Sequence, residues 1–124
     1  MLVITQYIAK HELNPLSRFL KIDDILNGAQ KVTKGLAIQT KSPENYKKFK
    51  FFKVRIGKKN FVRMIAFVLT ENKKVVPILI RLKKDKIFGM NMAMNNPEVV
   101  KQINKNLDFI IEDIQEKRYE EFQY

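Results

Sequence analysis

Three apolar runs in the middle of the chain decide the fold: FFKVRI at 51–56, FVRMIAFVL at 61–69 and VVPILIRL at 75–82. Their Val, Ile and Phe side chains pack well on the pleated surface of a sheet, and short polar segments separate the runs. This pattern predicts three strands joined by hairpins. Because Pro77 has no backbone N–H to donate to a neighbouring strand, we expect a bulge or an unpaired stretch in the third run.

The loop between the first two strands sets which of their side chains face each other. If residues 58–60 form a three-residue loop, Arg55 lies directly opposite Arg63. Alternate residues of a strand share a face, so Lys53 lies on the same face as Arg55. A shift of one residue would send the two arginines to opposite faces.

The second hairpin extends this arrangement. If residues 71–73 form a three-residue loop, Leu69 pairs with Val75 and Arg63 lies opposite Arg81. The three arginines then form a row across three strands, called the arginine row below. Like charges that face each other across a ladder repel, so the row predicts a negatively charged partner. Phosphate suits the planar, permanently charged guanidinium.

The segments that precede these strands predict further elements. Residues 2–8 are β-branched and aromatic, which predicts a first strand. From Leu16, apolar residues recur mostly with helical spacing until Gly28 interrupts them. Residues 29–40 fit either a second short helix or an irregular connection, and residues 42–45 predict a turn.

The C-terminal part predicts a long helix. Residues 95–98 read Asn-Asn-Pro-Glu, which is a capping residue, a proline and an acid where a helix begins. An apolar stripe then continues to about Glu116 and consists of Val100, Ile103, Leu107, Ile110 and Ile114. We expect it to pack on the chain's own sheet, with docking on a partner chain as the alternative. Residues 117–124 carry no clear pattern. The whole predicts an α+β fold for a single domain, 1–124, with an antiparallel sheet and helices on one side.

The positive charge of the protein is concentrated in one segment. The formal net charge is +11. Residues 47–86 hold fourteen lysines and arginines against two acidic residues, whereas the rest of the chain holds ten against eleven. Such a concentration predicts a polyanionic partner, and nucleic acid is favoured over an anionic membrane or an acidic protein.

Several classes of function are disfavoured by composition. The chain has no cysteine and one histidine, His11, which excludes a disulfide scaffold, a thiolate zinc site, a cysteine nucleophile and a two-histidine ribonuclease. No apolar run approaches the roughly 18–20 residues that span a bilayer. The N-terminal residues do not read as a signal peptide, so we expect a cytoplasmic protein without a membrane partner.

Arginines and lysines are suited to one reaction in particular. RNA is cleaved when its own 2′-hydroxyl attacks the adjacent phosphate, a step that needs charge stabilisation and some proton transfer. Arginines supply the first, and a lysine with a perturbed pKa can help with the second. A metal-dependent nuclease would need clustered carboxylates, and the basic segment has only Glu71 and Asp85. We therefore expect neither a metal nor another cofactor.

These strands carry a family resemblance. The order of a strand, a helical region and a three-strand meander, with FKVRI, VRMIAF and VVPILIRLKKDK in turn, resembles the RelE/ParE superfamily of bacterial toxins. The resemblance implies a RelE-like fold with a four-stranded, mostly antiparallel sheet, an N-terminal helical region and a long C-terminal helix. It also implies a toxin of a type II toxin–antitoxin system. Many members are mRNA interferases that cleave message on the ribosome, and a minority poison DNA gyrase.

The resemblance assigns roles to residues of this chain. Arg63 matches the arginine that holds the scissile phosphate, and Lys53 and Arg55 match the residues that contact and activate the RNA. The predicted catalytic residues are Arg55, Arg63, Arg81 and Lys84. The predicted RNA-binding residues are Lys53, Lys58, Lys59, Lys83, Lys86 and Phe88. Many relatives have a base-stacking tyrosine where this chain has Ile87 and Phe88, and Phe88 has no hydroxyl to donate a proton.

Two other readings stay open. The same basic sheet would serve a non-catalytic nucleic-acid-binding module or a gyrase-directed toxin. Alternatively, the arginines form salt bridges to acids of the final helix, namely Asp108, Glu112, Asp113 and Glu116. The expected partners are RNA, in the form of ribosome-bound mRNA, and an acidic, partly disordered antitoxin.

Overall fold

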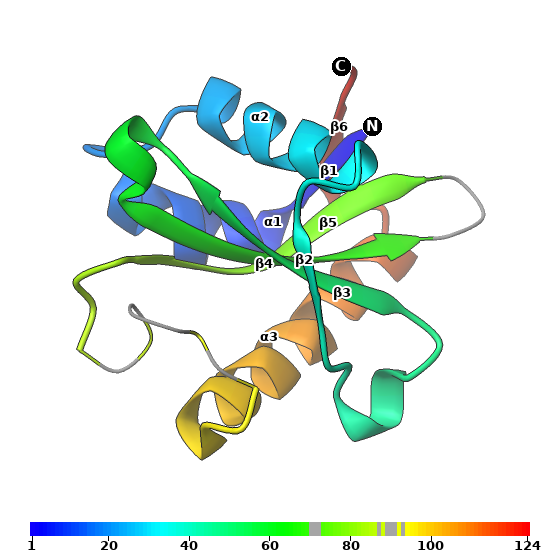
Figure 1. The fold of residues 1–124 in the computed structure, drawn as a ribbon. Helices are drawn as coiled ribbons and strands as arrows, with labels where there is room; N and C mark the ends of the chain where they lie inside the picture. Colours follow the sequence, from blue (N-terminus) through cyan, green and yellow to red (C-terminus); the bar gives the residue numbers. More distant parts are fainter. Residues whose placement is uncertain (70–72, 87, 89–91, 93) are drawn as a thin grey trace.

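A mixed sheet forms the centre of the molecule, which is known from a computed structural model that describes residues 1–69, 73–86, 88, 92 and 94–124 (Figure 1). The described residues form six strands in the order β2-β3-β4-β5-β1-β6, in which β1 runs parallel to β5 and the other neighbours are antiparallel. The strands are β1 (Leu2–Thr5), β2 (Ile38–Thr40), β3 (Lys50–Ile56), β4 (Val62–Leu69), β5 (Lys74–Leu82) and β6 (Tyr119–Phe122). The predicted four strands were too few, because β2 and β6 come from segments that showed no strand pattern.

The helices differ from the prediction at their ends. β1 stops at Thr5, whose hydroxyl accepts the Ile8 N–H and caps α1 (Gln6–Ile8), so the predicted strand at 2–8 was too long. A π-helix (Ala9–Leu13) and a 3₁₀ turn (Asn14–Leu16) continue α1. 3₁₀ turns also form at Glu44–Tyr46, which overlaps the turn predicted at 42–45, and at Lys58–Asn60.

α2 (Ile22–Thr33) runs through Gly28, which therefore does not end a helix as predicted. Gly28 lies where this helix meets the sheet. A Cβ atom there would lie 2.5 Å from Cγ2 of Ile56 and 2.9 Å from Cε of Met64. The absence of a side chain at Gly28 is what lets α2 approach so closely.

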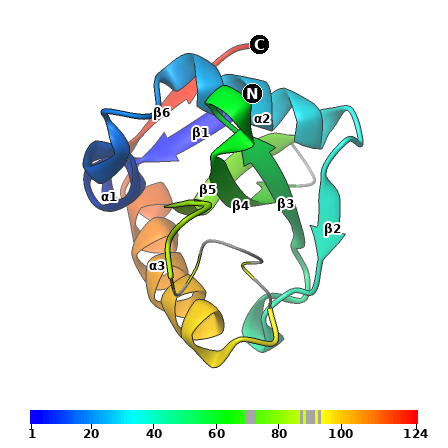
Figure 2. The same cartoon turned by 60° about the vertical axis from the view of Figure 1, so that its left-hand side comes forward.

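Helices cover both faces of the sheet. α2 lies on one face and α3 (Pro97–Gln115) crosses the other, as both views show (Figures 1 and 2). The expectation of helices on one side was wrong. α3 begins as predicted, with Asn96 as its cap and Pro97 in its first turn. Its buried apolar residues are Val99, Ile103, Leu107 and Ile110. The stripe thus packs into the chain's own core, and Val100 and Ile114 at its margins are half-buried.

The ladder between β4 and β5 contains the bulge expected near Pro77. Leu69 pairs with Lys74, not with Val75 as predicted, and Ala66 pairs with Pro77. From Ile65, opposite Leu79, the register is shifted by one residue, so Ile78 is the extra residue of β5. Residues 71 and 72 of the predicted loop lie outside the described residues. The bulge restores the predicted register at the far end of the hairpin, where Arg63 lies opposite Arg81.

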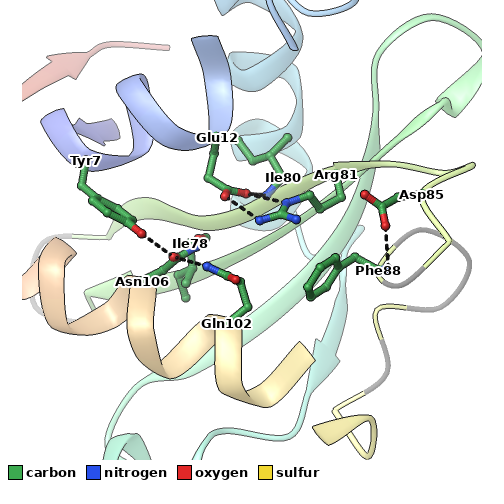
Figure 3. A network of polar contacts seen from close by, with 9 residues as sticks. All are labelled: Tyr7, Glu12, Ile78, Ile80, Arg81, Asp85, Phe88, Gln102 and Asn106. Carbon is green, nitrogen blue, oxygen red and sulfur yellow. Dashed lines mark hydrogen bonds and ion pairs between the residues drawn. The ribbon is translucent and has the colours of Figure 1, made fainter. Parts of the chain in front are cut away.

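Two side chains complete the edge of β5 beyond its contact with β1. The Glu12 carboxylate accepts the Ile80 N–H at 2.7 Å, and the Asn106 amide donates to the carbonyl of the bulged Ile78 at 2.8 Å (Figure 3). Asn106 also accepts hydrogen bonds from Tyr7 and Gln102. Backbone groups that a neighbouring strand would otherwise satisfy are thus bonded by side chains of the π-helix and α3.

Asn106 is expected to contribute strongly to stability. Asn106→Ala leaves the buried Ile78 carbonyl without its donor, and we expect the free energy of unfolding to fall by about 2–3 kcal/mol. Urea denaturation followed by circular dichroism measures this. Asn104→Ala, a half-buried position on the same helix, is the matched control, with an expected change within about 0.5 kcal/mol. Equal midpoints for the two variants would contradict the role of Asn106.

Candidate nucleic-acid interface

The arginine row predicted from strand parity is present. Arg55 lies opposite Arg63, and Arg63 lies opposite Arg81, across β3, β4 and β5. Each arginine is within two residues of the end of its strand, so the row lies at the end of the sheet, beside the hairpin at 57–61. Side chains that face each other in an antiparallel ladder are about 4.5–5.5 Å apart at Cβ. The three side chains therefore start from adjacent positions on one face of the sheet.

Arg81 has a buried acidic partner. Its Nη2 lies 3.0 Å from Oε2 of Glu12 and its Nε lies 3.2 Å from Oε1, a two-pronged contact (Figure 3). Glu12 is 3% exposed. The ring of Phe88 lies 4.4 Å from the guanidinium carbon on another side, which adds a cation–π contact. Arg81 is thereby fixed and its charge is neutralised.

Glu12 is the residue of this site that the sequence did not reveal. Residues 6–13 form helical turns instead of the strand end expected there, and these turns bring Glu12 over β5. One signal was available, because Glu12 is the only acidic residue among the first 22.

Arg63 is the buried member of the row and is 6% exposed. Its Nη1 donates to the backbone carbonyl of Asn60 at 2.6 Å, which ties the row to the hairpin. Among the described residues no buried side-chain nitrogen or oxygen lacks a hydrogen-bond partner, so the other nitrogens of Arg63 are not sealed from solvent. Burial and the charge of Arg55 lower the pKa of Arg63 below its ordinary value. Arginine still carries its charge at neutral pH.

Arg55 and Lys53 extend the cluster along β3. The Arg55 side chain is exposed, and its guanidinium makes no ion pair within the part of the chain that the structure describes. Lys53 is half-buried, and its register partner Ile65 lies on the same face as Arg63. Burial lowers the pKa of the Lys53 amine, and the charges of Arg63 and Arg55 lower it further. The amine is thus easier to deprotonate than an ordinary lysine.

The acids of α3 do not neutralise this cluster, so the alternative of salt bridges to that helix was wrong. Asp113 pairs with Arg118 at 2.9 Å, and Glu112 pairs with the same arginine at 3.3 Å. Asp108 accepts a hydrogen bond from Tyr46. Among the described residues, the acid that reaches the row is Glu12, and it binds Arg81 alone of the three arginines.

The remaining predicted site residues lie around the same end of the sheet. Lys58 and Lys59 are exposed on the hairpin turn, and Lys83, Lys84 and Lys86 are exposed after β5. Lys84, a predicted catalytic residue, has its amine 6.0 Å from the ring centre of Phe19. Phe88 is 9% exposed and packs on Arg81, which leaves little of its ring for stacking on a base. Ile87 lies outside the described residues.

Other features of the described chain bear on possible ligands. Within residues 1–69, 73–86, 88, 92 and 94–124, no three His, Asp or Glu side chains gather as a metal ion would require. The helices of that same part are too short or too polar to cross a bilayer. His11 is exposed, with its ring centre 4.4 Å from that of Tyr7.

The charge cluster can be tested through Lys53. We expect Arg55→Ala to raise the pKa of the Lys53 amine toward its ordinary value, because one of the charges that oppose its protonation is removed. A ¹³C NMR titration of the lysine Cε signals measures this pKa. Arg18→Ala, which removes a guanidinium outside the row, is the control. An unchanged Lys53 titration in Arg55→Ala would contradict the arrangement.

Comparison of the chain with known proteins identifies no relative. No protein-family model, no curated protein and no solved structure matches the chain. Its function has to follow from the chemistry of its own residues.

Proposed function

We propose that this protein binds RNA along the arginine row and cleaves it, as an mRNA interferase toxin of a type II toxin–antitoxin system. The observation that carries the proposal is the row itself: three arginines in register, of which only Arg81 has a carboxylate partner among the residues that the structure describes. Within the described residues, the three arginines hold more positive charge than Glu12 offsets. The RelE/ParE resemblance of the strands supports the same function.

A phosphodiester chain is the partner that best relieves the repulsion within the row. Like charges opposite each other in a ladder destabilise a sheet, and Arg63 and Arg55 remain without an acid among the described residues. A phosphate group between them would accept hydrogen bonds from both guanidinium groups. The lysines around the row, Lys58, Lys59, Lys83 and Lys86, would contact neighbouring phosphates.

The proposed cleavage needs only the groups of the row and of the RNA. The 2′-hydroxyl gives its proton to the neutral Lys53 amine and attacks the adjacent phosphorus. Arg55 and Arg63 stabilise the charge that builds up on the phosphate oxygens. The bond to the 5′-oxygen breaks, and this oxygen takes a proton from solvent. The products are a 2′,3′-cyclic phosphate and a 5′-hydroxyl, and no metal enters these steps.

Arg81 and Lys84 take other roles in this proposal than the predicted catalytic ones. The hydrogen bonds to Glu12 hold the Arg81 guanidinium in place and occupy its Nε and Nη2 donors. Arg81 therefore shapes the row and contributes its remaining donors to the RNA. Lys84, next to Phe19, binds the RNA backbone away from the scissile phosphate. The antitoxin would cover the row with an acidic segment.

Cleavage can be tested in a reconstituted translation reaction, with breaks in the mRNA mapped by primer extension with and without ribosomes. We expect breaks at defined positions with the wild-type protein. Because Arg55 is exposed, Arg55→Ala should fold normally and cleave about a hundredfold more slowly, while RNA affinity falls less than tenfold.

Lys101→Ala, on the exposed side of α3, is the charge-matched control and should cleave like the wild type. Arg63→Lys, which keeps a charge at the buried position, shows whether the guanidinium itself is needed. Intact message in every lane would reject cleavage.

The pH dependence of cleavage tests the role of Lys53. The neutral amine is the proposed base, so the rate should rise with pH and level off above the lowered pKa of Lys53. Lys53→Met should remove this limb of the profile and leave RNA binding within a few fold. A single-turnover pH–rate profile measures it. An identical profile in Lys53→Met would assign the base elsewhere.

A purely binding function is the second candidate, either as a nucleic-acid-binding module or as a gyrase-directed toxin. The observation that favours it is the pairing of Arg81 with Glu12, which leaves the row without a carboxylate or imidazole base among the described residues. In that case Arg55→Ala would weaken nucleic-acid binding and lower the salt dependence of that binding, and neither the variant nor the wild type would cleave RNA. A DNA supercoiling assay with gyrase then identifies the second toxin class.

A further inference from the structure

A hollow lies at the same end of the sheet as the arginine row, between the hairpin and the segment that leads into α2. It is lined by Ser17, Arg18, Phe19, Leu20, Lys21, Asp24, Gly57 and Lys58. This segment and the hairpin meet at the left of Figure 1, where the chain also leaves β5. The sequence predicted no function for the segment at 17–21. In the structure this segment lies beside Lys58, which is a predicted RNA-binding residue.

Phe19 is an exposed aromatic ring within a group of positive charges. It is 53% exposed, and the Lys84 amine lies 6.0 Å from its ring centre. Arg18, Lys21 and Lys58 line the same hollow. The one acid of the lining, Asp24, already accepts the backbone N–H of Lys21 at 2.9 Å. The hollow thus joins a free ring face to a positive rim.

We propose that this hollow is a nucleotide subsite for single-stranded RNA, in which a base stacks on Phe19 and the flanking phosphates contact Arg18, Lys58 and Lys84. The proposal rests on RNA binding at the arginine row and extends it. Stacking of bases on aromatic side chains inside positively charged grooves is the general way in which proteins hold single strands. It also supplies the base contact that the buried Phe88 is badly placed to make.

The hairpin connects the hollow to the row. Its Asn60 carbonyl accepts from Arg63, and its Phe61 carbonyl accepts the Lys83 N–H at 2.6 Å. Gly57 and Lys58 of the same hairpin line the hollow. The hollow lies on the face that α2 covers and the row lies on the opposite face, so an RNA strand that leaves the row would pass around the end of the sheet, by Lys59 and Lys58, before it reaches Phe19. In this arrangement, Lys84 belongs to the subsite and not to the reacting centre.

A surface that combines basic and aromatic side chains can bind either a nucleotide or an anionic membrane. The shape of this surface favours the nucleotide. A bilayer needs a protruding apolar face, whereas Phe19 lies on the wall of a hollow. A nucleotide offers a flat ring that can stack on Phe19 and phosphates that can contact the basic residues around it.

The chain contains no tryptophan, so Phe19→Trp introduces a single reporter. We would titrate this variant with short fluorescein-labelled single-stranded RNA and read tryptophan emission and label anisotropy together. We expect binding to quench the tryptophan, and Phe19→Ala to weaken RNA binding about tenfold or more. Phe109→Trp, at a ring that is 44% exposed on α3, is the matched control and should not be quenched. Polyphosphate, which has no bases, should bind without quenching.

Each result decides the proposal. Quenching of the tryptophan by RNA and weaker RNA binding by Phe19→Ala support the subsite. The same titration with single-stranded DNA shows whether binding depends on the 2′-hydroxyl of the sugar. If RNA binds in an Arg55-dependent way but neither Phe19 variant responds, the subsite is wrong and RNA binding at the row stands. If no RNA binds at all, both proposals are wrong. A blue shift with phosphatidylglycerol vesicles and no response to RNA would overturn the subsite in favour of a lipid surface.

Discussion

The carboxylate of Glu12 is the group on which the geometry of this molecule depends most. β1 turns into α1 after four residues, so the end of β5 lacks a neighbouring strand where the arginine row begins. Glu12 takes the place of that strand by accepting the Ile80 N–H, and it holds Arg81 with both oxygens. A buried carboxylate is costly unless it is paired and hydrogen-bonded, and here both conditions are met. One side chain thus ends the sheet and orders the row.

Strand parity and the length of the first hairpin loop were enough to predict the three central strands and the pairing of Arg55 with Arg63, because both depend on local sequence. The prediction at the β4–β5 hairpin was nevertheless right for an incomplete reason. Leu69 does not pair with Val75, and the extra residue Ile78 brings Arg81 back to the face of Arg63. Pro77 indicated that a bulge would form, but its position follows from packing and from the Asn106 amide that bonds the Ile78 carbonyl.

The missed elements share a physical cause, which is that they depend on distant partners. β2 and β6 are short edge strands with few apolar residues, and they form because β3 and β1 offer unpaired edges. Gly28 reads as a helix end in sequence, yet it is retained inside α2 by its close approach to Ile56. The burial of Phe88 against Arg81 follows from tertiary packing in the same way, and no local pattern indicated it.

The bulge at Ile78 means that the charge pattern of this face is set by chain length as well as by residue type. If the ladder continued from Ala66 and Pro77 without the bulge, Ile80 would face Arg63, and Arg81 would turn toward the apolar side covered by α2. A one-residue insertion or deletion that the bulge does not absorb is therefore enough to create or erase the row in a related sequence, even if every arginine is kept. Descent within such a lineage would be better traced through insertions in this strand than through the identity of its charged residues.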